Sequence, residues 1–379
     1  MKKLVRAFTV PQSIDLIRPF ISDLQKDYEL IILSSEGPEW EQVKRDFPNV
    51  KCIVVPIERR MSVISDIKSV YHLVKVFRRE RPDIVHSMTG KSGILNMISA
   101  KISNVPYRIH TFTGLLFPTA SGLMRVLFEV VDKITCRCAT HVIPEGEGVK
   151  ADLIRRHITR KPLKVLGHGN VKGIDLDLFS RNDDVMHKAK ILKKSGVFTF
   201  VFVGRLLGDK GINELISAFD MLEKDYPDVR IILVGPDEQK LDPLTAYTNN
   251  KISSDPRIEY VGSQSDVRPF YAAADVAVLP SYREGFPNCV LEAGAMGLPQ
   301  IVTDINGSRE IIHQGENGLI VPTHNAEALY KAMKKMIEDK ELYRHCAANA
   351  RSMIASRFEQ TYVKKCLFEF YSHIIANDI

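Results

Sequence analysis

The sequence predicts an α/β protein made of two doubly wound domains, each built on a parallel sheet with helices on both faces. Short apolar runs alternate with amphipathic stretches in the first half, as in residues 3–10 followed by residues 14–26. The same alternation restarts at residue 198, and a chain of 379 residues exceeds the size at which one hydrophobic core usually stops growing. Strands that alternate with helices indicate parallel sheets covered on both sides, so two such domains are expected.

A glycine-rich stretch over residues 162–179 interrupts this alternation and lacks helical periodicity. Such a pause predicts a linker between domains. We therefore expect a first domain over residues 1–180 and a second domain over residues 181–358. Residues 359–379 carry apolar side chains at helical spacing, which predicts a terminal amphipathic helix that packs on the rest of the protein.

Composition and charge narrow the class of protein. The chain is 45% hydrophobic and 26% charged, which is typical of folded domains rather than of disordered or membrane-spanning chains. A net charge of +6 suits an anionic ligand, and nucleic acid, a lipid head group or a phosphorylated small molecule would each fit. Residues 62–81 predict a helix with apolar and basic side chains, for which a solvated basic face is favoured over a membrane-contact face.

The six cysteines lack the paired two-residue spacing of structural zinc sites, so they are interpreted as thiols in a reducing compartment. The N-terminal residues run directly into a predicted strand rather than into the apolar core of a signal peptide. No apolar run reaches the roughly 18 residues that a spanning helix needs. A cytoplasmic protein is expected, one that touches a membrane at most from that side.

The first candidate site is a loop between a buried strand and a helix. Residues 277–284 predict the strand and the start of the loop, and residues 288–296 predict a helix with Asn288 as its N-cap. Helix N-termini present amide groups and a partial positive charge, which suits a phosphate or a sugar hydroxyl. The expected donors are the amides of Phe286, Asn288 and Cys289. Pro287 contributes no amide but stiffens the turn.

Two carboxylates flank this loop. Glu284 precedes the helix and Glu292 lies within its early turns, so each can accept hydrogen bonds from vicinal hydroxyls, one set on a ribose and one on a second sugar. The alternative makes Glu292 an ordinary helix residue and Glu284 a solvated loop charge. The Gly-Phe-Pro-Asn loop between them favours the binding role.

The second candidate site follows the predicted strand at residues 198–203. Gly204 and Arg205 come directly after this strand, and Lys210 lies at the start of the next helix. Two cations beside glycines can neutralise a diphosphate that departs with negative charge. A strand that merely ends in Gly-Arg is the alternative, and the spacing to the Glu284 loop favours function.

Two strand ends in the first half complete the candidate set. His110 ends a predicted strand that leads to Gly114, and it would face the same ligand if the two domains oppose each other; a structural histidine is the alternative. Lys91 and Ser92 follow another predicted strand, where Lys91 would meet an anionic acceptor or would be an ordinary surface lysine. Lys91, Ser92 and Gly114 are expected to contact the acceptor, whereas His110 would hydrogen-bond the transferred sugar or its phosphate.

Two further motifs are rejected on context. Residues 167–173 contain three glycines, but the spacing before the third is one residue longer than that of a dinucleotide-binding loop, and the segment lies in the linker. Asp175 and Asp177 resemble a metal-binding aspartate pair, yet no histidine lies nearby. We predict no metal and no cofactor.

Glu284 and Glu292, separated by seven residues, together with Arg205, Lys210 and His110, resemble the motifs of the retaining GT-B glycosyltransferases of family four, also called group-one glycosyltransferases. The likeness spans nearly the whole chain. It implies two Rossmann-like domains that face a central cleft, with the donor mainly in the second. It also implies a last helix that crosses back onto the first domain, and transfer with retained configuration without a metal.

The resemblance also implies a role for each residue. Glu292 would hold the ribose hydroxyls, Glu284 and the backbone of residues 286–289 would hold the transferred sugar, and Arg205 with Lys210 would stabilise the departing diphosphate. Residues 86–92 and 110–114 are similar to those of bacterial enzymes that extend lipid-linked saccharides for capsule, O-antigen or glycoprotein glycans.

Apolar side chains at residues 115–117 and 123–131 fit either contact with a polyprenyl acceptor or burial in the core. The leading hypothesis is a transferase that uses a UDP-sugar, with UDP-N-acetylhexosamine as first choice, and a saccharide on polyprenyl diphosphate, with no nucleic-acid partner. Two alternatives stay open. A nucleotide-sugar epimerase of the same fold would need no acceptor, and a two-lobed sugar-binding protein would normally carry an export signal.

Overall fold

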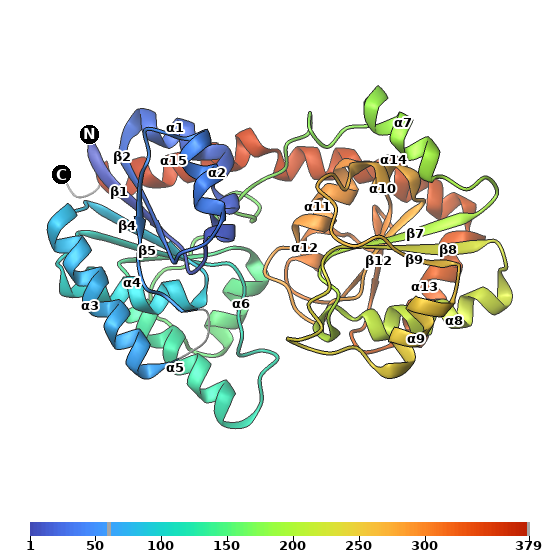
Figure 1. Cartoon of the computed structure of the whole chain (residues 1–379), viewed down its shortest axis with the longest axis horizontal. Coiled ribbons are helices and arrows are strands. Elements are labelled where there is room, and N and C mark those ends of the chain that lie inside the picture. The colour runs from blue at the N-terminus through green and yellow to red at the C-terminus, as the bar shows by residue number, and fades with distance from the viewer. Residues whose placement is uncertain (59–61, 377–379) are drawn as a thin grey trace. The chain divides into compact units, whose positions relative to one another are not determined.

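The computed structural model describes residues 1–58 and 62–376, which form two compact units (Figure 1). The first unit comprises Met1–Lys172 together with Val363–Ile379, and the second comprises Gly173–Tyr362. One division falls at Lys172–Gly173, within the glycine-rich stretch. The last three residues of the expected terminal segment, 377–379, lie outside the described residues.

The first unit is a six-stranded parallel sheet in the order β3-β2-β1-β4-β5-β6. Its strands are β1 (Lys2–Ala7), β2 (Tyr28–Ser34), β3 (Lys51–Val54), β4 (Ile84–Met88), β5 (Tyr107–Phe112) and β6 (His141–Pro144). Its helices are η1 (Pro11–Leu16), η2 (Arg18–Phe20), α1 (Ile21–Asp27), α2 (Glu39–Asp46), α3 (Val63–Glu80), α4 (Gly90–Ile102), α5 (Gly122–Cys138), α6 (Glu147–Arg155) and most of α15 (Gln360–Ala376).

Alternate side chains of the strands enter two different core layers, since successive residues of a strand point to opposite faces. Leu4 packs with α1, α2 and α15, whereas Val5 packs with α3, α4 and α5. Figure 1 shows these two groups of helices on opposite faces of the sheet. The central strands β1 and β4 are largely buried, and this burial includes the polar side chains of Arg6, His86 and Ser87.

The second unit is a six-stranded parallel sheet in the order β12-β11-β10-β7-β8-β9. Its strands are β7 (Phe198–Val203), β8 (Val229–Val234), β9 (Ile258–Tyr260), β10 (Val276–Leu279), β11 (Gln300–Thr303) and β12 (Gly318–Val321). Its helices are α7 (Asp183–Leu192), η3 (Gly208–Lys210), α8 (Ile212–Asp225), α9 (Ala246–Ser254), α10 (Arg268–Ala273), α11 (Asn288–Ala295), α12 (Ser308–Ile311), α13 (Ala326–Glu338) and α14 (Lys340–Phe358).

Figure 1 shows α8, α9 and α13 on one face of this sheet and α7, α10 and α14 on the other. The larger core cluster includes side chains of α8, α13 and α14, and a smaller cluster includes side chains of α7 and α10. Two parallel sheets with helices on both faces confirm the predicted α/β, doubly wound class. Strand order reverses between β1 and β4 in the first sheet and between β7 and β10 in the second. Ligands of doubly wound sheets bind outside the strand ends at such switch points.

The predicted helix over residues 14–26 is only partly correct. The segment begins with two short 3-10 turns, η1 and η2, and only Ile21–Asp27 is α-helical. Pro19 explains the difference, because it supplies no amide and disfavours the α conformation at Arg18.

Apolar side chains of α3 have divided environments. Leu73 and Phe77 are buried, whereas Val63 and Ile67, in the first half of the helix, are exposed. The expectation of a solvated basic face is therefore incomplete, because the solvated surface of α3 also carries apolar side chains. In the described part of the chain, no helix combines the length and apolar character needed to cross a bilayer.

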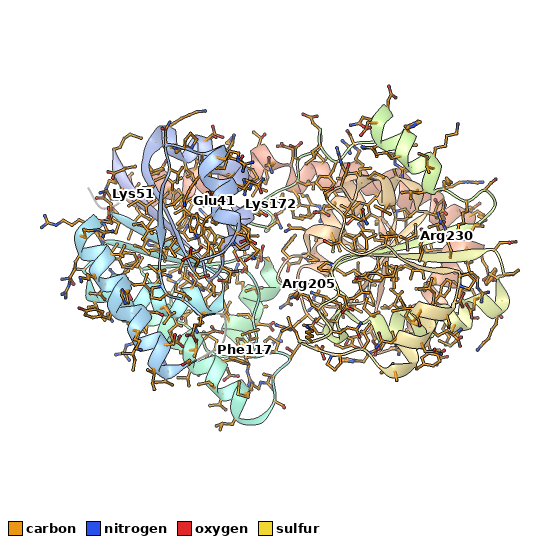
Figure 2. The ribbon with its side chains drawn as sticks, in the orientation of Figure 1. Glu41, Lys51, Phe117, Lys172, Arg205 and Arg230 are labelled. Carbon is orange, nitrogen blue, oxygen red and sulfur yellow. The ribbon has the colours of Figure 1, made fainter. Side chains whose placement is uncertain are left out.

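The apolar side chains at residues 115–117 and 123–131 are also partly buried and partly exposed. Leu115 and Phe117, the latter labelled in Figure 2, belong to the core. In contrast, Leu123 and Val130 of α5 are exposed. Burial in the core therefore explains the apolar side chains at residues 115 and 117, but not those of Leu123 and Val130.

Candidate functional site

The switch point of the second sheet brings together two of the predicted site residues. Lys210 ends η3, which follows β7, and Glu284 lies in the loop after β10. Lys210 Nζ lies 2.5 Å from Glu284 Oε1, and both side chains are mostly shielded, with exposed fractions of 12% and 19%. Because β7 and β10 are hydrogen-bonded neighbours, their carboxyl ends hold a cation and a carboxylate side by side.

The two loops are tied together by contacts that the sequence did not indicate. Tyr282 N donates to Asp209 O at 2.9 Å, and an Arg283 guanidinium nitrogen lies 3.0 Å from Asp209 Oδ2. Asp209 N in turn donates to Asp242 Oδ2 at 2.6 Å. Asp209, Asp242 and Arg283 thus position the loops that carry Lys210 and Glu284.

Glycines allow the close approach of these loops. Gly211 has a φ of +71°, and a Cβ at this position would lie 2.0 Å from Pro280 O. Gly307, at the start of α12, has a φ of +73°, and its Cβ would lie 2.4 Å from Gly285 O. The Glu284 loop is therefore packed between two backbone segments that need glycine.

Helix α11 begins at Asn288 with Pro287 as its N-cap, so the prediction that Asn288 caps the helix is wrong by one residue. Pro287 O accepts from the amide of Val290, and the ring of Phe286 packs edge-on against Phe358 at 5.3 Å between ring centroids. Helix geometry leaves first-turn amides such as that of Cys289 without a carbonyl partner inside the helix. Burial raises the pKa of the Cys289 thiol, which therefore stays protonated at neutral pH.

Glu292 lies on α11 beside Tyr271 of α10. Tyr271 OH lies 3.2 Å from Glu292 Oε2 and 3.2 Å from Cys289 O. Burial raises the pKa of Tyr271 well above its usual value, so the phenol is a donor. Tyr271 was not predicted from the sequence. Its hydroxyl donates to the Glu292 carboxylate and so positions it.

Arg205, labelled in Figure 2, follows Gly204 directly after β7. Its guanidinium NH1 donates to Glu238 Oε2 at 2.8 Å, and both side chains are partly exposed. Gly204 N donates to Val234 O at 2.9 Å, which continues the β7–β8 ladder by one residue. Arg205 therefore pairs with a carboxylate from the β8 loop, while Lys210 pairs across the switch point with Glu284.

His110 lies within β5, two residues before the strand ends at Phe112, rather than at the strand end as predicted. It is only 1% exposed, so it does not project into solvent. Its ring packs against Gly93, where a Cβ would lie 2.4 Å from the ring carbon Cε1, and its Nδ1 lies 2.9 Å from Ser87 Oγ. Burial lowers the pKa of His110 to about 3. The imidazole is therefore neutral at pH 7, which suits hydrogen bonding rather than charge stabilisation.

Two buried histidines predict acid sensitivity of the first unit. The pKa of His110 falls to about 3 and that of His86 falls well below 6.5, both chiefly through burial, so each stabilises the fold above the unfolded pKa. That stability is lost as pH falls from about 6.5, at up to about 1.4 kcal/mol per pH unit for each histidine. Burial raises the pKa of Asp132 to about 7, which acts in the opposite sense between about 4 and 7.

The contribution of His110 can be isolated by comparing the unfolding free energies of the unaltered protein and the His110→Gln variant. Asp132 is present in both, so its contribution cancels. The stability advantage of the unaltered protein over this variant, measured by urea unfolding, should shrink as pH is lowered from about 7 to about 5. The matched control is His187→Gln, which removes an exposed histidine instead of a buried one. A constant difference for His110→Gln would contradict its buried, neutral state.

The switch point of the first sheet contains the predicted acceptor residues. Lys91 is not a surface lysine, because its Nζ lies 2.7 Å from Asp66 Oδ1 and its side chain is 8% exposed. Ser92 is buried, and its hydroxyl donates to Ala7 O at 3.0 Å. Thr89 has a φ of +70° and its hydroxyl lies 2.9 Å from that of Thr9. These contacts join the ends of β1 and β4, while Gly114 lies in the partly exposed loop after β5.

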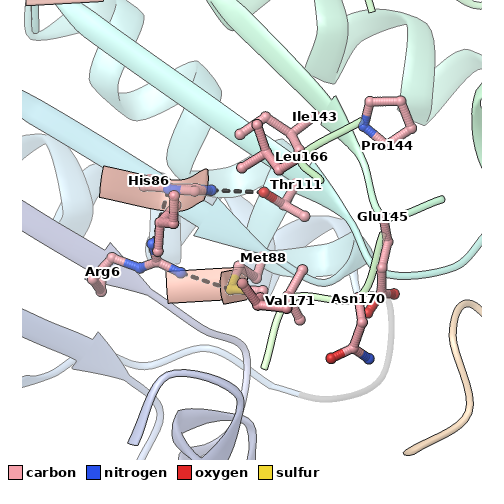
Figure 3. A pocket seen from close by; sticks show the side chains of 12 residues that line it. Arg6, His86, Met88, Thr111, Ile143, Pro144, Glu145, Leu166, Asn170 and Val171 are labelled. Atoms are coloured by element: carbon pink, nitrogen blue, oxygen red, sulfur yellow. Dashed lines mark hydrogen bonds between the residues drawn. The ribbon is translucent and has the colours of Figure 1, made fainter. Parts of the chain in front are cut away.

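A buried polar cluster lies in the same unit (Figure 3). Arg6 of β1 donates to Tyr371 OH at 2.5 Å and lies 2.9 Å from His86 Nδ1 and from Met88 Sδ. His86 Nε2 lies 2.7 Å from Thr111 Oγ1. The adjacent cavity measures about 20 Å³, room for a single water molecule. This cluster anchors α15 to the sheet rather than forming an open binding site.

Among residues 1–58 and 62–376, no group of three or more histidine, cysteine or acidic side chains has the arrangement of a metal site. Asp175 instead shapes a turn, since its Oδ1 accepts from the amides of Asp177 and Leu178. The assignment of Asp175 as a structural residue is confirmed.

Comparison with known proteins identifies a family model in each unit. A profile of the family described as glycosyl transferases group 1 matches residues 185–353, and one described as glycosyl transferase 4-like matches residues 7–144. Among solved structures, Anabaena HepE in complex with UDP and glucose has a TM-score of 0.81 at 18% identity, covering 98% of this chain and 100% of that chain. This likeness shows the shared GT-B fold.

Three relatives match over most of their length. Capsular polysaccharide biosynthesis glycosyltransferase CapM of Staphylococcus aureus is 29% identical, covering 98% of this chain and 97% of the relative. The Escherichia coli UDP-Gal:alpha-D-GlcNAc-diphosphoundecaprenol alpha-1,3-galactosyltransferase is 28% identical, covering 87% and 85%. The Campylobacter jejuni N,N'-diacetylbacillosaminyl-diphospho-undecaprenol alpha-1,3-N-acetylgalactosaminyltransferase is 28% identical, covering 95% of each.

The two matched profiles lie one in each unit, and the group 1 profile spans Arg205, Lys210, Glu284 and Glu292. The family resemblance that these residues carry in the sequence is thereby confirmed. The chain thus carries a group 1 glycosyl transferase domain over residues 185–353 and a glycosyl transferase 4-like domain over residues 7–144.

Proposed function

We propose that this protein transfers a sugar from a UDP-sugar, with UDP-N-acetylhexosamine as first choice, to a saccharide carried on polyprenyl diphosphate, in the assembly of a bacterial surface glycan. The observation that carries this proposal is the Lys210–Glu284 pair at the switch point of the second sheet. The names of the Escherichia coli and Campylobacter jejuni relatives support the donor and acceptor classes.

In the donor half of the site, the carboxylates bind sugar hydroxyls and the cations bind the diphosphate. Glu292 accepts hydrogen bonds from the ribose hydroxyls, and Glu284 accepts them from the transferred sugar, helped by the backbone of residues 286–289. Lys210 and Arg205 neutralise the diphosphate. Each of these cations already holds a carboxylate, so the diphosphate replaces Glu238 beside Arg205 and shares Lys210 with Glu284.

The reaction retains the anomeric configuration and uses no metal. The acceptor hydroxyl attacks the anomeric carbon from the face that the diphosphate leaves, the bond from that carbon to the phosphate oxygen breaks, and the departing phosphate takes the hydroxyl proton. Charge grows on the diphosphate during this step, and preorganised cations stabilise it more than they stabilise the ground state. Lys210 and Arg205 therefore supply the stabilisation that a metal ion would otherwise provide.

The acceptor half lies at the β1–β4 switch point of the first sheet. In this proposal Lys91, Ser92 and Gly114 shape the loops that receive the acceptor, and His110 acts as a neutral hydrogen-bonding group beneath them. The protein works on the cytoplasmic side of the membrane, where nucleotide sugars are available.

Two measurements test this function. Calorimetry with UDP-, GDP-, ADP- and CDP-sugars identifies the donor, and incubation of that donor with polyprenyl-diphosphate saccharides identifies transfer. A lengthened lipid-linked saccharide is the expected product. Release of an altered nucleotide sugar without any acceptor would instead make the protein an epimerase, and sugar binding without nucleotide binding would refute the proposal.

Glu292→Ala should weaken binding of the nucleotide sugar by about ten- to hundredfold, the range for loss of hydrogen bonds to a charged group. Tyr271→Phe should weaken it less, because the carboxylate remains and only its support is lost. The matched control is Glu327→Ala, which removes an exposed carboxylate of α13. Unchanged donor affinity in Glu292→Ala, measured by calorimetry, would remove this carboxylate from the donor site.

A further inference from the structure

We infer that α5 and the groove at its C-terminal end form a docking surface for an anionic lipid bilayer. Helix α5 lies beside α4 on one face of the first unit's sheet (Figure 1). This inference takes from the proposed function only the idea that the acceptor is embedded in a membrane. Binding to the bilayer itself requires neither substrate.

The first observation is an apolar ridge along α5 that the fold leaves exposed. Its members are spaced so that they share one side of the helix, and Leu123 is 84% exposed. The ridge consists of Leu123, Met124, Val126, Leu127, Val130 and Ile134. Six neighbouring exposed aliphatic side chains are costly in water, so the ridge is expected to have a partner.

The second observation is a basic groove at the end of the same helix. The groove is open and measures about 550 Å³, and four of its eight lining residues are cationic while none is acidic. These four are Lys133, Arg137, Arg160 and Lys161. Lys133 and Arg137 belong to α5 itself, so the groove continues the apolar ridge.

The cations of the groove are not neutralised by the fold. Among the described residues, Lys133, Arg137 and Arg160 have no carboxylate partner, whereas the nearby Arg155 and Arg156 pair with Asp152 and Glu129. Lys161 Nζ donates to the Cys136 carbonyl at 2.7 Å and also to the Ala139 carbonyl, so it caps the end of α5. A cluster of unpaired cations attracts anions.

The chemistry of the surface selects one occupant. A bilayer offers both partners at once, because acyl chains cover an apolar ridge while anionic head groups meet the cations beside it. Nucleic acid would leave the ridge in water. A second copy of the chain, joined through the same surface by two-fold symmetry, would offer the cations only the same ridge and groove, and no acidic side chain lines that groove.

Vesicle sedimentation tests the inference on the full chain. The protein should bind vesicles containing about 30% phosphatidylglycerol in phosphatidylcholine and bind pure phosphatidylcholine far less, and about 0.5 M NaCl should weaken the binding. The triple variant Lys133→Gln, Arg137→Gln and Arg160→Gln should bind anionic vesicles about 100-fold more weakly. Lys161 stays unchanged because it caps the helix.

The matched control removes the same charge elsewhere, with Lys190→Gln, Lys193→Gln and Lys194→Gln at exposed positions of the second unit. It should bind vesicles nearly as well as the unaltered protein. The double variant Leu123→Gln with Leu127→Gln tests the ridge and should reduce vesicle binding. Ile191→Gln, which replaces an exposed apolar side chain of α7, should not reduce it. Unfolding midpoints close to that of the unaltered protein would show that every variant is folded.

The outcomes separate this inference from the proposed function. Equal vesicle binding by the groove variant and its charge control would overturn the docking surface, as would self-association of the unaltered protein that the ridge variant abolishes. Lys210→Met should bind vesicles normally, because it alters only the donor site. Loss of vesicle binding in the groove variant, with transfer to a short water-soluble acceptor retained, is the expected combination.

Discussion

Replacing Lys210 with methionine is expected to lower kcat for sugar transfer by about two to three orders of magnitude, the usual effect of removing a preorganised electrostatic group. The Lys210 ammonium lies at the switch point where the strand order reverses in the second sheet, 2.5 Å from Glu284 Oε1. Its loss removes a charge that interacts most strongly with the diphosphate as negative charge develops. The donor affinity should therefore fall much less than kcat.

Two companion variants make this result specific. Lys188→Met removes an exposed lysine paired with Asp184 and should leave kcat unchanged. Glu284→Gln should also lower kcat, but through loss of contacts to the transferred sugar, so its effect should depend on which sugar the donor carries. A folded Lys210→Met protein with kcat within about threefold of normal would exclude an electrostatic role for Lys210.

The local segments of this site could be predicted because their signals are close together in the sequence. The β10 strand, its polar loop and helix α11 are marked by an apolar run, a Gly-Phe-Pro turn and a helical pattern within about twenty residues. Even the helix start differs from the prediction by only one residue. Pro287 takes the cap position without a side-chain hydrogen bond, so the usual Asn signal was misleading.

The pairing of groups across the sheet could not be predicted in the same way. Lys210 and Glu284 are 74 positions apart, and their contact depends on β7 being next to β10. Arg6 and Tyr371 are 365 positions apart and meet only because α15 returns to the first unit. Sequence periodicity describes which face of an element is apolar, but not which elements become neighbours.

The strands were located to within a few residues of their ends, but the burial of the side chains near those ends was not predicted. Lys91 was expected either to meet an anionic acceptor or to be a surface lysine, but α3 places Asp66 Oδ1 2.7 Å from its Nζ. His110 looked like a strand-end ligand, but the bare backbone of Gly93 lets α4 pack directly on its ring. In both cases a neighbouring helix buries the side chain. The sequence around the buried residue does not show which helix will cover it.

Gly211→Ala is expected to destabilise the second unit and to lower transfer activity at the same time. An alanine with φ near +71° costs about 1–2 kcal/mol in backbone strain. Its Cβ would also lie 2.0 Å from Pro280 O, a backbone atom that can move only by displacing the loop after β10. We expect a total loss of about 3–5 kcal/mol in the free energy of unfolding, measured by urea denaturation.

Gly262→Ala separates the two causes. Gly262 has a φ of +69°, and a Cβ there would meet nothing within 4 Å, so this variant carries the backbone strain without the clash. It should lose about 1–2 kcal/mol and keep its activity. The additional loss in Gly211→Ala then measures how firmly the β7 loop presses on the β10 loop. Equal losses in the two variants would mean that the loops give way freely, in which case their packing would not hold Lys210 against Glu284.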